Sequence, residues 1–260
     1  MATGQPSTRG DGHGGEQHPP GTLGTVRNAV LLLDLLSVGP RYQQLTDLAE
    51  RSGLSLPTTH RVLRSLAAPG LVEQDPESQR YGLGPELVRL SERYLARLSV
   101  VRTMAPYLVE LRNTTKETIL AALLMRGSTV YVDRIEGEHV GDIFRESGRI
   151  RPALATAPGR LLAARAGDAA WTEAVANGST DGGITARDRA SWAAAPHLVT
   201  IDAPDRWEAA VPITPPGGDA VAAIAATGSL ERHSEEAVVE LVVPQLARAA
   251  AAVSRVLSHD

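Results

Sequence analysis

The sequence contains no cysteine, which excludes disulfide bonds, thiolate metal sites and a cysteine nucleophile. Lysine is almost absent too, because Lys116 is the single lysine among 26 basic residues. Aromatic residues make up 3% of the chain, so its cores are expected to consist mainly of alanine, leucine and valine. A chain without cysteine fits a cytoplasmic protein, because disulfide bonds are rare in the reducing cytoplasm and proteins there are stable without them.

Long apolar runs are also missing. No uninterrupted stretch of about 18 apolar residues is present, which is the length needed to span a bilayer. The first residues lack the positive start and the apolar run of a secretory signal. We therefore expect a soluble protein that makes no contact with a membrane.

Common catalytic signatures are not found either. The chain has no G-x-S-x-G, no H-E-x-x-H and no G-x-x-x-x-G-K motif. His139, His197 and His233 are dispersed, and the nearby acids Asp133 and Glu136 fit a solvated strand edge better than paired-carboxylate chemistry. We expect no enzymatic activity, no catalytic residue, no cofactor and no metal site.

The length of 260 residues favours two domains of about 100–150 residues each. Residues 1–22 are rich in glycine, proline, serine, histidine and glutamine, and are predicted to be a disordered tail. From Thr25 onward apolar residues recur at helical spacing, up to Gly39 and Pro40. The members of this stripe are Val26, Ala29, Val30, Leu33 and Leu36.

A second helix is predicted over residues 44–52 with Gly53 as its stop, and a third over residues 55–66. Only Gly53 and Leu54 separate the two helices, which is typical of a helix-turn-helix. In the third helix Ser55 is expected to cap the N-terminus, and Pro57 falls in the first turn.

The third helix, S-L-P-T-T-H-R-V-L-R-S-L, separates apolar from polar side chains. Winding at about 3.6 residues per turn places Val62, Leu63 and Leu66 on one side. The opposite side carries Thr58, Arg61, Arg64 and Ser65. Residues 55–68 contain no acidic residue, although the whole chain has a net charge of -4. This face is either a DNA-contacting surface or the solvated side of an ordinary surface helix.

Two short apolar runs around Asp75-Pro76 predict a β-hairpin after the third helix, which would make the domain a winged helix-turn-helix over residues 23–84. Arg80, at the start of the second strand, is placed either to meet a DNA phosphate or to pair with Glu73, Asp75 or Glu77. Residues 23–98 hold nine arginines and eight acidic residues, a net charge of +1, so affinity for DNA would depend on a few well-placed contacts and on dimerisation.

Residues 85–100 are predicted to form a linker helix. Its apolar stripe, which packs either on its own domain or on a second subunit, consists of Leu87, Leu90, Tyr94 and Leu98. Residues 101–260 then predict a mixed domain that begins with a helix over 101–113. Strands are expected over 118–124, 129–135, 141–146, 197–201, 207–214 and 220–227, with helices opening at Ala155 and near residues 169 and 186 and a last helix over 234–257. This order fits an α+β fold with an antiparallel sheet.

Several motifs resemble, in order and spacing, the IclR family of bacterial transcriptional regulators. They are L-T-D-L-A at 45–49, S-G-L at 52–54, H-R-V-L-R-S-L at 60–66, P-G-L-V at 69–72, R-Y-G-L-G-P at 80–85, A-P-Y-L-V-E-L at 105–111, V-Y-V-D-R-I-E at 130–136 and A-T-A-P-G-R at 155–160. The resemblance implies an N-terminal winged helix-turn-helix, a linker helix and a C-terminal effector-binding domain similar to GAF sensors, which also forms homodimers or homotetramers.

The resemblance also implies two sets of site residues. The DNA-contacting set is Thr58, Thr59, Arg61, Arg64 and Ser65, to which the wing adds Arg80, and Arg61 and Arg64 are the candidates for base contact. The effector-binding set is Ala155, Thr156, Ala157, Trp207, Glu208, Ala225 and Thr227. Glu208 stands where family members have a cysteine, and it would repel an anionic effector unless Arg160 or Arg206 neutralised the site.

These features predict a repressor or activator that binds a double-stranded DNA operator and is gated by a small-molecule effector. The departures in the effector set leave a second hypothesis open. In that hypothesis the protein is a winged-helix regulator that acts without a ligand, by constitutive DNA binding or by contacts with partners.

Overall fold

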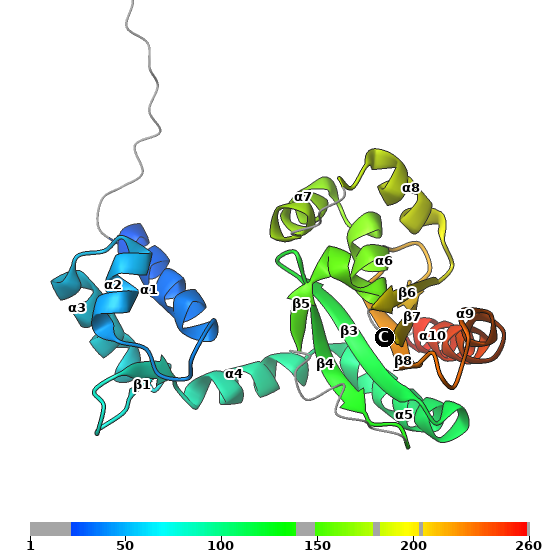
Figure 1. Cartoon of the computed structure of the whole chain (residues 1–260), viewed down its shortest axis with the longest axis horizontal. Coiled ribbons are helices and arrows are strands. Elements are labelled where there is room, and N and C mark those ends of the chain that lie inside the picture. The colour runs from blue at the N-terminus through cyan, green and yellow to red at the C-terminus, as the bar shows by residue number, and fades with distance from the viewer. Residues whose placement is uncertain (1–21, 139–148, 179–182, 203–204, 259–260) are drawn as a thin grey trace, which may run out of the picture. The chain divides into compact units, whose positions relative to one another are not determined.

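The computed structural model describes residues 22–138, 149–178, 183–202 and 205–258. They form two compact units that divide between Glu92 and Arg93, inside the segment predicted to be the linker. Figure 1 shows the helices and strands of both units. The predicted tail over residues 1–22 and the predicted strand over 141–146 lie almost entirely outside the described residues.

The N-terminal unit contains three helices and a two-stranded hairpin. The helices are α1 (Thr22–Ser37), α2 (Leu45–Ser52) and α3 (Leu56–Ala67), and the strands are β1 (Val72–Gln74) and β2 (Tyr81–Leu83). The strands pair antiparallel, with Glu73 opposite Gly82. Gly53 ends α2 in the left-handed conformation with φ 67, which a glycine adopts without steric strain. The predicted winged helix-turn-helix is confirmed.

One local expectation for these helices was wrong, and the burial of α1 is narrower than its apolar stripe. Ser55 stands at the N-cap of α3, but its hydroxyl accepts no backbone N–H and instead donates to Thr58 Oγ1 at 2.8 Å. In α1 the side chains that enter the core are led by Leu32 and Leu36, whereas Val26 and Val30 are 61% and 40% exposed. The apolar stripe of α1 is therefore wider than this unit needs for its own core.

Gln43, just before α2, joins three elements of the N-terminal unit. Its buried side-chain amide donates to the carbonyl oxygens of Leu36 and Val38 at the C-terminal end of α1, at 3.3 and 3.1 Å. Arg51 of α2 donates to the side-chain oxygen of Gln43 at 2.6 Å. The backbone of Gln43 exchanges hydrogen bonds with Tyr81 of β2 at 2.8 and 2.9 Å. This residue therefore fixes the wing against the helices.

Two helices follow the wing. No residue of α4 (Glu86–Leu95) is buried. Leu90 and Tyr94 of its apolar stripe are 44% and 49% exposed, and Val88, outside the stripe, is 63% exposed. The chain then turns and continues as α5 (Ser99–Thr115), whose Met104, Leu108 and Leu111 enter the core of the C-terminal unit.

A six-stranded antiparallel sheet forms the centre of the C-terminal unit. Its strands are β3 (Thr118–Met125), β4 (Ser128–Ile135), β5 (Ile150–Pro152), β6 (Leu198–Asp202), β7 (Arg206–Ile213) and β8 (Ala222–Ser229). Their order is β5-β4-β3-β8-β7-β6, so the short strands β5 and β6 are the two edges. The predicted α+β class with an antiparallel sheet is confirmed.

Helices cover both faces of this sheet (Figure 1). One face packs on α5 and α10 (Val243–Leu257), the other on α6 (Ala157–Arg165), which follows the 3-10 turn η2 (Ala153–Ala155). Helices α7 (Asp168–Asn177) and α8 (Ala186–Ala194) lie beside α6, with Ala174 and Trp192 in one apolar cluster with Ala163.

The last helix covers residues 235–257, as predicted, but it is not α-helical throughout. Between α9 (Glu235–Ala237) and α10 lies a π-helical stretch, η3 (Val238–Val242). Pro244 in the first turn of α10 has no N–H to donate, so the hydrogen-bond ladder widens just before it. The stretch Glu235–Leu257 is long and apolar enough to cross a membrane, but its buried residues, among them Leu246 and Val253, pack on the sheet as a core helix does.

Candidate nucleic-acid interface and effector site

The outer face of α3 presents two cationic side chains. Arg61 and Arg64 are exposed, and neither forms an ion pair with any residue in the described part of the chain. Val62, Leu63 and Leu66 seat the helix in the core of the N-terminal unit. The guanidinium groups are therefore held on a fixed helix and have all their donors available for an acceptor outside the unit.

The remaining predicted DNA contacts on α3 differ in accessibility. Thr59 is fully buried and its hydroxyl donates to the Ser55 carbonyl at 3.1 Å, so the structure contradicts its inclusion in the contact set. Thr58 is half-buried, and Ser65 is exposed but its hydroxyl donates to the Arg61 carbonyl at 2.9 Å. Position 59 lies on the core side of the helical wheel, which is why a side chain there cannot reach a groove.

Arg80 lies at the wing, exposed and without an ion pair to any residue that the structure describes. Two of the three acids that were expected to compete for it, Glu73 and Asp75, have other partners. Glu73 accepts a hydrogen bond from Tyr42 at 2.7 Å and pairs with Arg41 at 3.5 Å. Asp75 accepts hydrogen bonds from the Ser78 hydroxyl and, at 2.8 Å, from the Ser78 backbone N–H. These two bonds, the hydroxyl bond first, lower the pKa of the Asp75 carboxyl group. The geometry thus favours the phosphate-contact interpretation of Arg80.

His60 was not singled out by sequence reasoning, although it is exposed one helical turn before Arg64. The signal was available, since residues four apart share a helix face.

The predicted effector residues meet a buried cluster centred on Glu208. The Glu208 side chain is 7% exposed and lies between β7 and the N-terminus of α6. One carboxyl oxygen accepts the Ala157 backbone N–H at 2.9 Å, and the other accepts the Tyr131 hydroxyl at 2.5 Å. The first N–H groups of a helix carry partial positive charge, so the carboxyl group fills a position that suits an anion.

The cluster also depends on curvature of the sheet. Tyr131 is on β4 and Glu208 on β7, three strands apart, which is about 14 Å on a flat sheet. Side chains that stand upright on a flat sheet cannot meet across that distance, so their hydrogen bond shows that the sheet curls around this face. The ion pair between Arg151 of β5 and Asp202 of β6, at 3.0 Å, joins the two edges in the same way.

Three other members of the effector set, Thr156, Ala157 and Ala225, are buried by the protein itself, and Ala155 is half-buried. Thr156 is fully buried, shares a 2.7 Å hydrogen bond with Thr129 and caps α6 by accepting the Gly159 N–H at 3.1 Å, as predicted. A Cβ on Gly159 would lie 2.2 Å from the Thr129 hydroxyl, so only glycine fits there. Ala157 and Ala225 lie in one core cluster, and Ala155 belongs to the turn η2 before α6.

Trp207 and Thr227 take different positions, and only Thr227 lies beside Glu208, as its register partner on β8. Trp207 lies in the core on the α5 and α10 face, so the structure does not bring it together with Glu208. The Thr227 hydroxyl donates to the Trp207 carbonyl at 2.8 Å. The arginines named as neutralising groups have partners outside the Glu208 carboxyl group: Arg160 donates to the Leu154 carbonyl at 2.8 Å, and Arg206 pairs with Asp202 at 3.0 Å.

Burial raises the pKa of Glu208, partly opposed by the hydrogen bonds from Tyr131 and Ala157. A raised pKa means that the folded protein holds a proton at pH values where the unfolded chain has lost it. The contribution of Glu208 to stability therefore falls as pH rises from the ordinary glutamate pKa, about 4.3, toward its raised folded value.

We expect Glu208→Gln to remove this dependence, because an amide stays neutral and can both accept from Ala157 and donate to Tyr131. The unfolding free energy of the variant minus that of the wild type should increase between about pH 4 and pH 8. Urea unfolding at several pH values measures the difference, with the exposed Glu110→Gln as control. Parallel curves for wild type and Glu208→Gln would contradict the assignment.

A winged helix-turn-helix with exposed arginines, followed in the same chain by a helix-flanked antiparallel sheet, defines a DNA-binding transcriptional regulator with a ligand-binding domain. Two family descriptions match the chain, "IclR helix-turn-helix domain" over residues 25–76 and "Bacterial transcriptional regulator IclR C-terminal" over residues 92–189. The chain belongs to the IclR family of bacterial transcriptional regulators.

Individual relatives agree. The chain is 29% identical to the glycerol operon regulatory protein of Streptomyces griseus over 241 residues, which cover 89% of this chain and 95% of that one. It is 31% identical to the HTH-type transcriptional regulator XynR of Escherichia coli over 145 residues, 56% of this chain and 58% of XynR. These relatives are regulators rather than enzymes.

Solved structures show the same fold. An IclR transcriptional regulator from Alicyclobacillus acidocaldarius is 27% identical, with a TM-score of 0.72 over 90% of this chain and 98% of that one. An IclR homolog from Microbacterium hydrocarbonoxydans complexed with 4-hydroxybenzoate is 22% identical, with a TM-score of 0.68 over 91% and 100%.

Proposed function

We propose that the protein regulates transcription by placing α3 in the major groove of an operator, where Arg61 and Arg64 read base edges. The observation that carries this proposal is the pair of exposed guanidinium groups, without an ion-pair partner among the described residues, on a helix seated in the winged-helix core. Guanidinium groups bind guanine bidentately in the major groove. Thr58 and Ser65 at the flanks of the helix and Arg80 on the wing contact phosphates and set the register.

The protein acts as a homo-oligomer, a homodimer or homotetramer. The apolar stripe of α4 has no buried residue and leaves Leu90 and Tyr94 exposed, and Val26 and Val30 of α1 are exposed as well. Apolar side chains in such numbers on two helices favour a contact with a second copy, in keeping with the two-fold symmetry of operators. As a regulator of DNA it works in the cytoplasm, and it is not an enzyme.

The C-terminal unit regulates DNA binding in response to a small molecule. The buried cluster of Thr156, Ala157, Glu208, Ala225 and Thr227 is the site that the family resemblance implies, but the Glu208 carboxyl already takes the Ala157 N–H. A carboxylate effector therefore has no free donor there. This observation favours, as a second candidate function, a regulator whose DNA binding does not depend on a carboxylate at this cluster.

Genome-wide mapping of DNA bound by the full-length protein tests the proposed function. We expect the bound fragments to share a palindromic motif whose half-sites are separated by about one helical turn, 10–10.5 base pairs, or a multiple of it. Fragments without a common motif, or binding that does not distinguish the motif from scrambled DNA in a gel-shift assay, would contradict sequence-specific regulation.

A further inference from the structure

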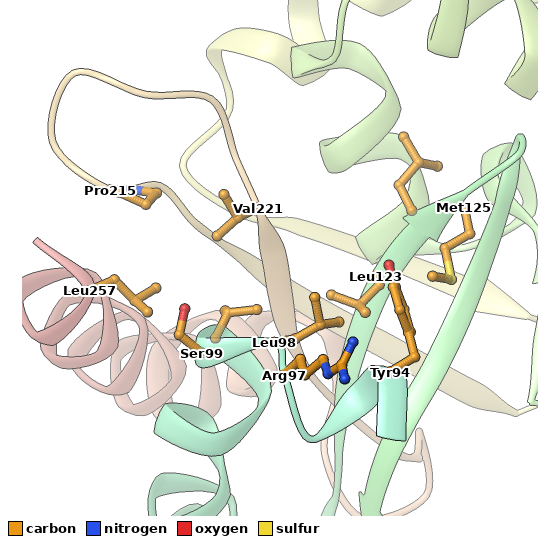
Figure 2. Close-up of a pocket in the computed structure, with 11 residues that line it drawn as sticks. Tyr94, Arg97, Leu98, Ser99, Leu123, Met125, Pro215, Val221 and Leu257 are labelled. Carbon is orange, nitrogen blue, oxygen red and sulfur yellow. The ribbon is translucent and has the colours of Figure 1, made fainter. Parts of the chain in front are cut away.

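A pocket of about 480 Å³ lies in the C-terminal unit, where α4 gives way to α5 (Figure 2). Eight of its eleven lining residues are apolar. Figure 2 shows Tyr94 and Arg97 on one side of it and Pro215, Val221 and Leu257 on the other, with Leu123 of β3 between them. A volume in the range of about 300–1,000 Å³ and an apolar lining are typical of small-molecule sites.

The three polar lining residues all come from one short segment. They are Tyr94, Arg97 and Ser99, at the end of α4 and the start of α5. Within the ranges that the structure covers, none of their side chains forms a hydrogen bond or an ion pair. The lining contains no acidic residue. One wall of the pocket therefore offers a cation and two hydroxyl groups that have no acceptor in the protein.

We propose that this pocket binds a small amphiphilic anion, an organic acid with an apolar body. The acid group lies against Arg97, with Tyr94 and Ser99 as further donors, and the apolar body packs on Leu123 and Leu257. Charge complementarity selects the anion, since a guanidinium group is always charged and no carboxylate of the lining competes for it.

This pocket is separate from the buried Glu208 cluster. Leu123 belongs to the core on the α5 and α10 face of the sheet, whereas Glu208 packs at the N-terminus of α6 on the opposite face. The donors of the Glu208 cluster are occupied, and those of the pocket are not. Binding to the pocket does not depend on the proposed function, but a regulatory effect of the ligand does. Residues 94–99 follow the helix-turn-helix unit in the chain through α4, so a ligand bound there contacts the segment that connects to the DNA-binding residues.

Binding is tested with three probes of equal chain length on the full-length protein, by titration calorimetry and thermal shift. The probes are octanoate, 1-octanol and octylamine, which are anionic, neutral and cationic. We expect saturable binding of octanoate at least about tenfold tighter than that of the other two. Equal binding of all three would show only apolar adsorption, and absence of saturable octanoate binding would overturn the site.

Two variants locate the probe. Arg97→Gln should weaken octanoate binding about tenfold, while Arg102→Gln, an exposed arginine on α5 outside the lining, should not. Val221→Trp should fill the pocket and abolish binding, and Val109→Trp, on an exposed position of α5, serves as its control. If Val221→Trp leaves octanoate binding intact, the pocket is not the binding site. If the variant lowers the oligomeric state in sedimentation, the pocket is a contact between copies. Either result overturns the proposal.

A separate readout distinguishes this proposal from the proposed function. Operator affinity is measured by gel shift with and without octanoate, in wild type and Arg97→Gln. Operator binding that is intact without octanoate, together with a failure of octanoate to bind, overturns the pocket alone. Octanoate binding in a protein that does not recognise any operator overturns the regulatory function and leaves the pocket standing.

Discussion

Replacing Arg61 and Arg64 together by alanine lowers operator affinity by at least about 30-fold. Each bidentate arginine–guanine contact contributes about 1–3 kcal/mol of base discrimination, and 1.4 kcal/mol is about a factor of ten. The fold of the N-terminal unit should not change, because both side chains are exposed and the seat of α3 is made by other residues. Gel shifts on the mapped operator measure the loss.

The single variants separate base reading from phosphate contact. Arg61→Ala and Arg64→Ala should each relax preference at one base pair, whereas Arg80→Ala should weaken binding to all sequences and reduce the salt slope by about one. Arg27→Ala, an exposed arginine of α1, is the control for loss of charge. Unchanged affinity in the double variant would remove α3 from the interface.

Replacing Arg232 by methionine lowers the unfolding free energy of the C-terminal unit by about 3–5 kcal/mol, the range for a buried ion pair that loses one partner. Glu117 is 1% exposed and is held by an ion pair with Arg232. His233 Nδ1 lies 3.1 Å from the other Glu117 oxygen, at ion-pair distance but without hydrogen-bond geometry. Burial raises the pKa of Glu117, and Arg232 and, less strongly, His233 oppose that rise, so the variant removes the stronger of these two partners of a buried carboxyl group.

Urea unfolding of Arg232→Met and of the double variant Glu117→Leu/Arg232→Met checks this result. The double variant should recover most of the lost stability, because it removes the buried charge together with its partner. Lys116→Met breaks the neighbouring exposed pair between Lys116 and Glu138, whose side chains are 51% and 41% exposed, and should lower stability by less than about 1 kcal/mol. Equal losses from the two single variants would contradict the importance of burial.

Helical periodicity predicted the N-terminal unit well because its determinants are local. The pattern alone placed Thr58, Arg61, Arg64 and Ser65 on the outer side of α3, and only the family resemblance added Thr59, which is buried. The caps were less predictable. Thr156 accepts the expected backbone N–H and Ser55 does not, although both residue types are common at this position.

The effector set was harder to predict, because strand alternation and sheet curvature determine which of its side chains lie close together. Trp207 and Glu208 are consecutive residues of β7, so they must point to opposite faces, and one of them could not line the predicted site. Tyr131 became the partner of Glu208 only because strands three apart approach each other on the curled sheet. The pocket at residues 94–99 is lined by four separate stretches of the chain, so a local sequence pattern cannot predict it.

The ion pair between Arg151 and Asp202 has a consequence for assembly. It ties together the two outermost strands, β5 and β6, which have only 3 and 5 residues. A long edge strand exposes many unpaired backbone N–H and C=O groups, with which a strand of another chain can pair. Short edge strands that are joined to each other expose few such groups. Copies of this protein are therefore expected to associate through helices, and its sensor unit should resist the edge-to-edge aggregation to which open sheets are prone.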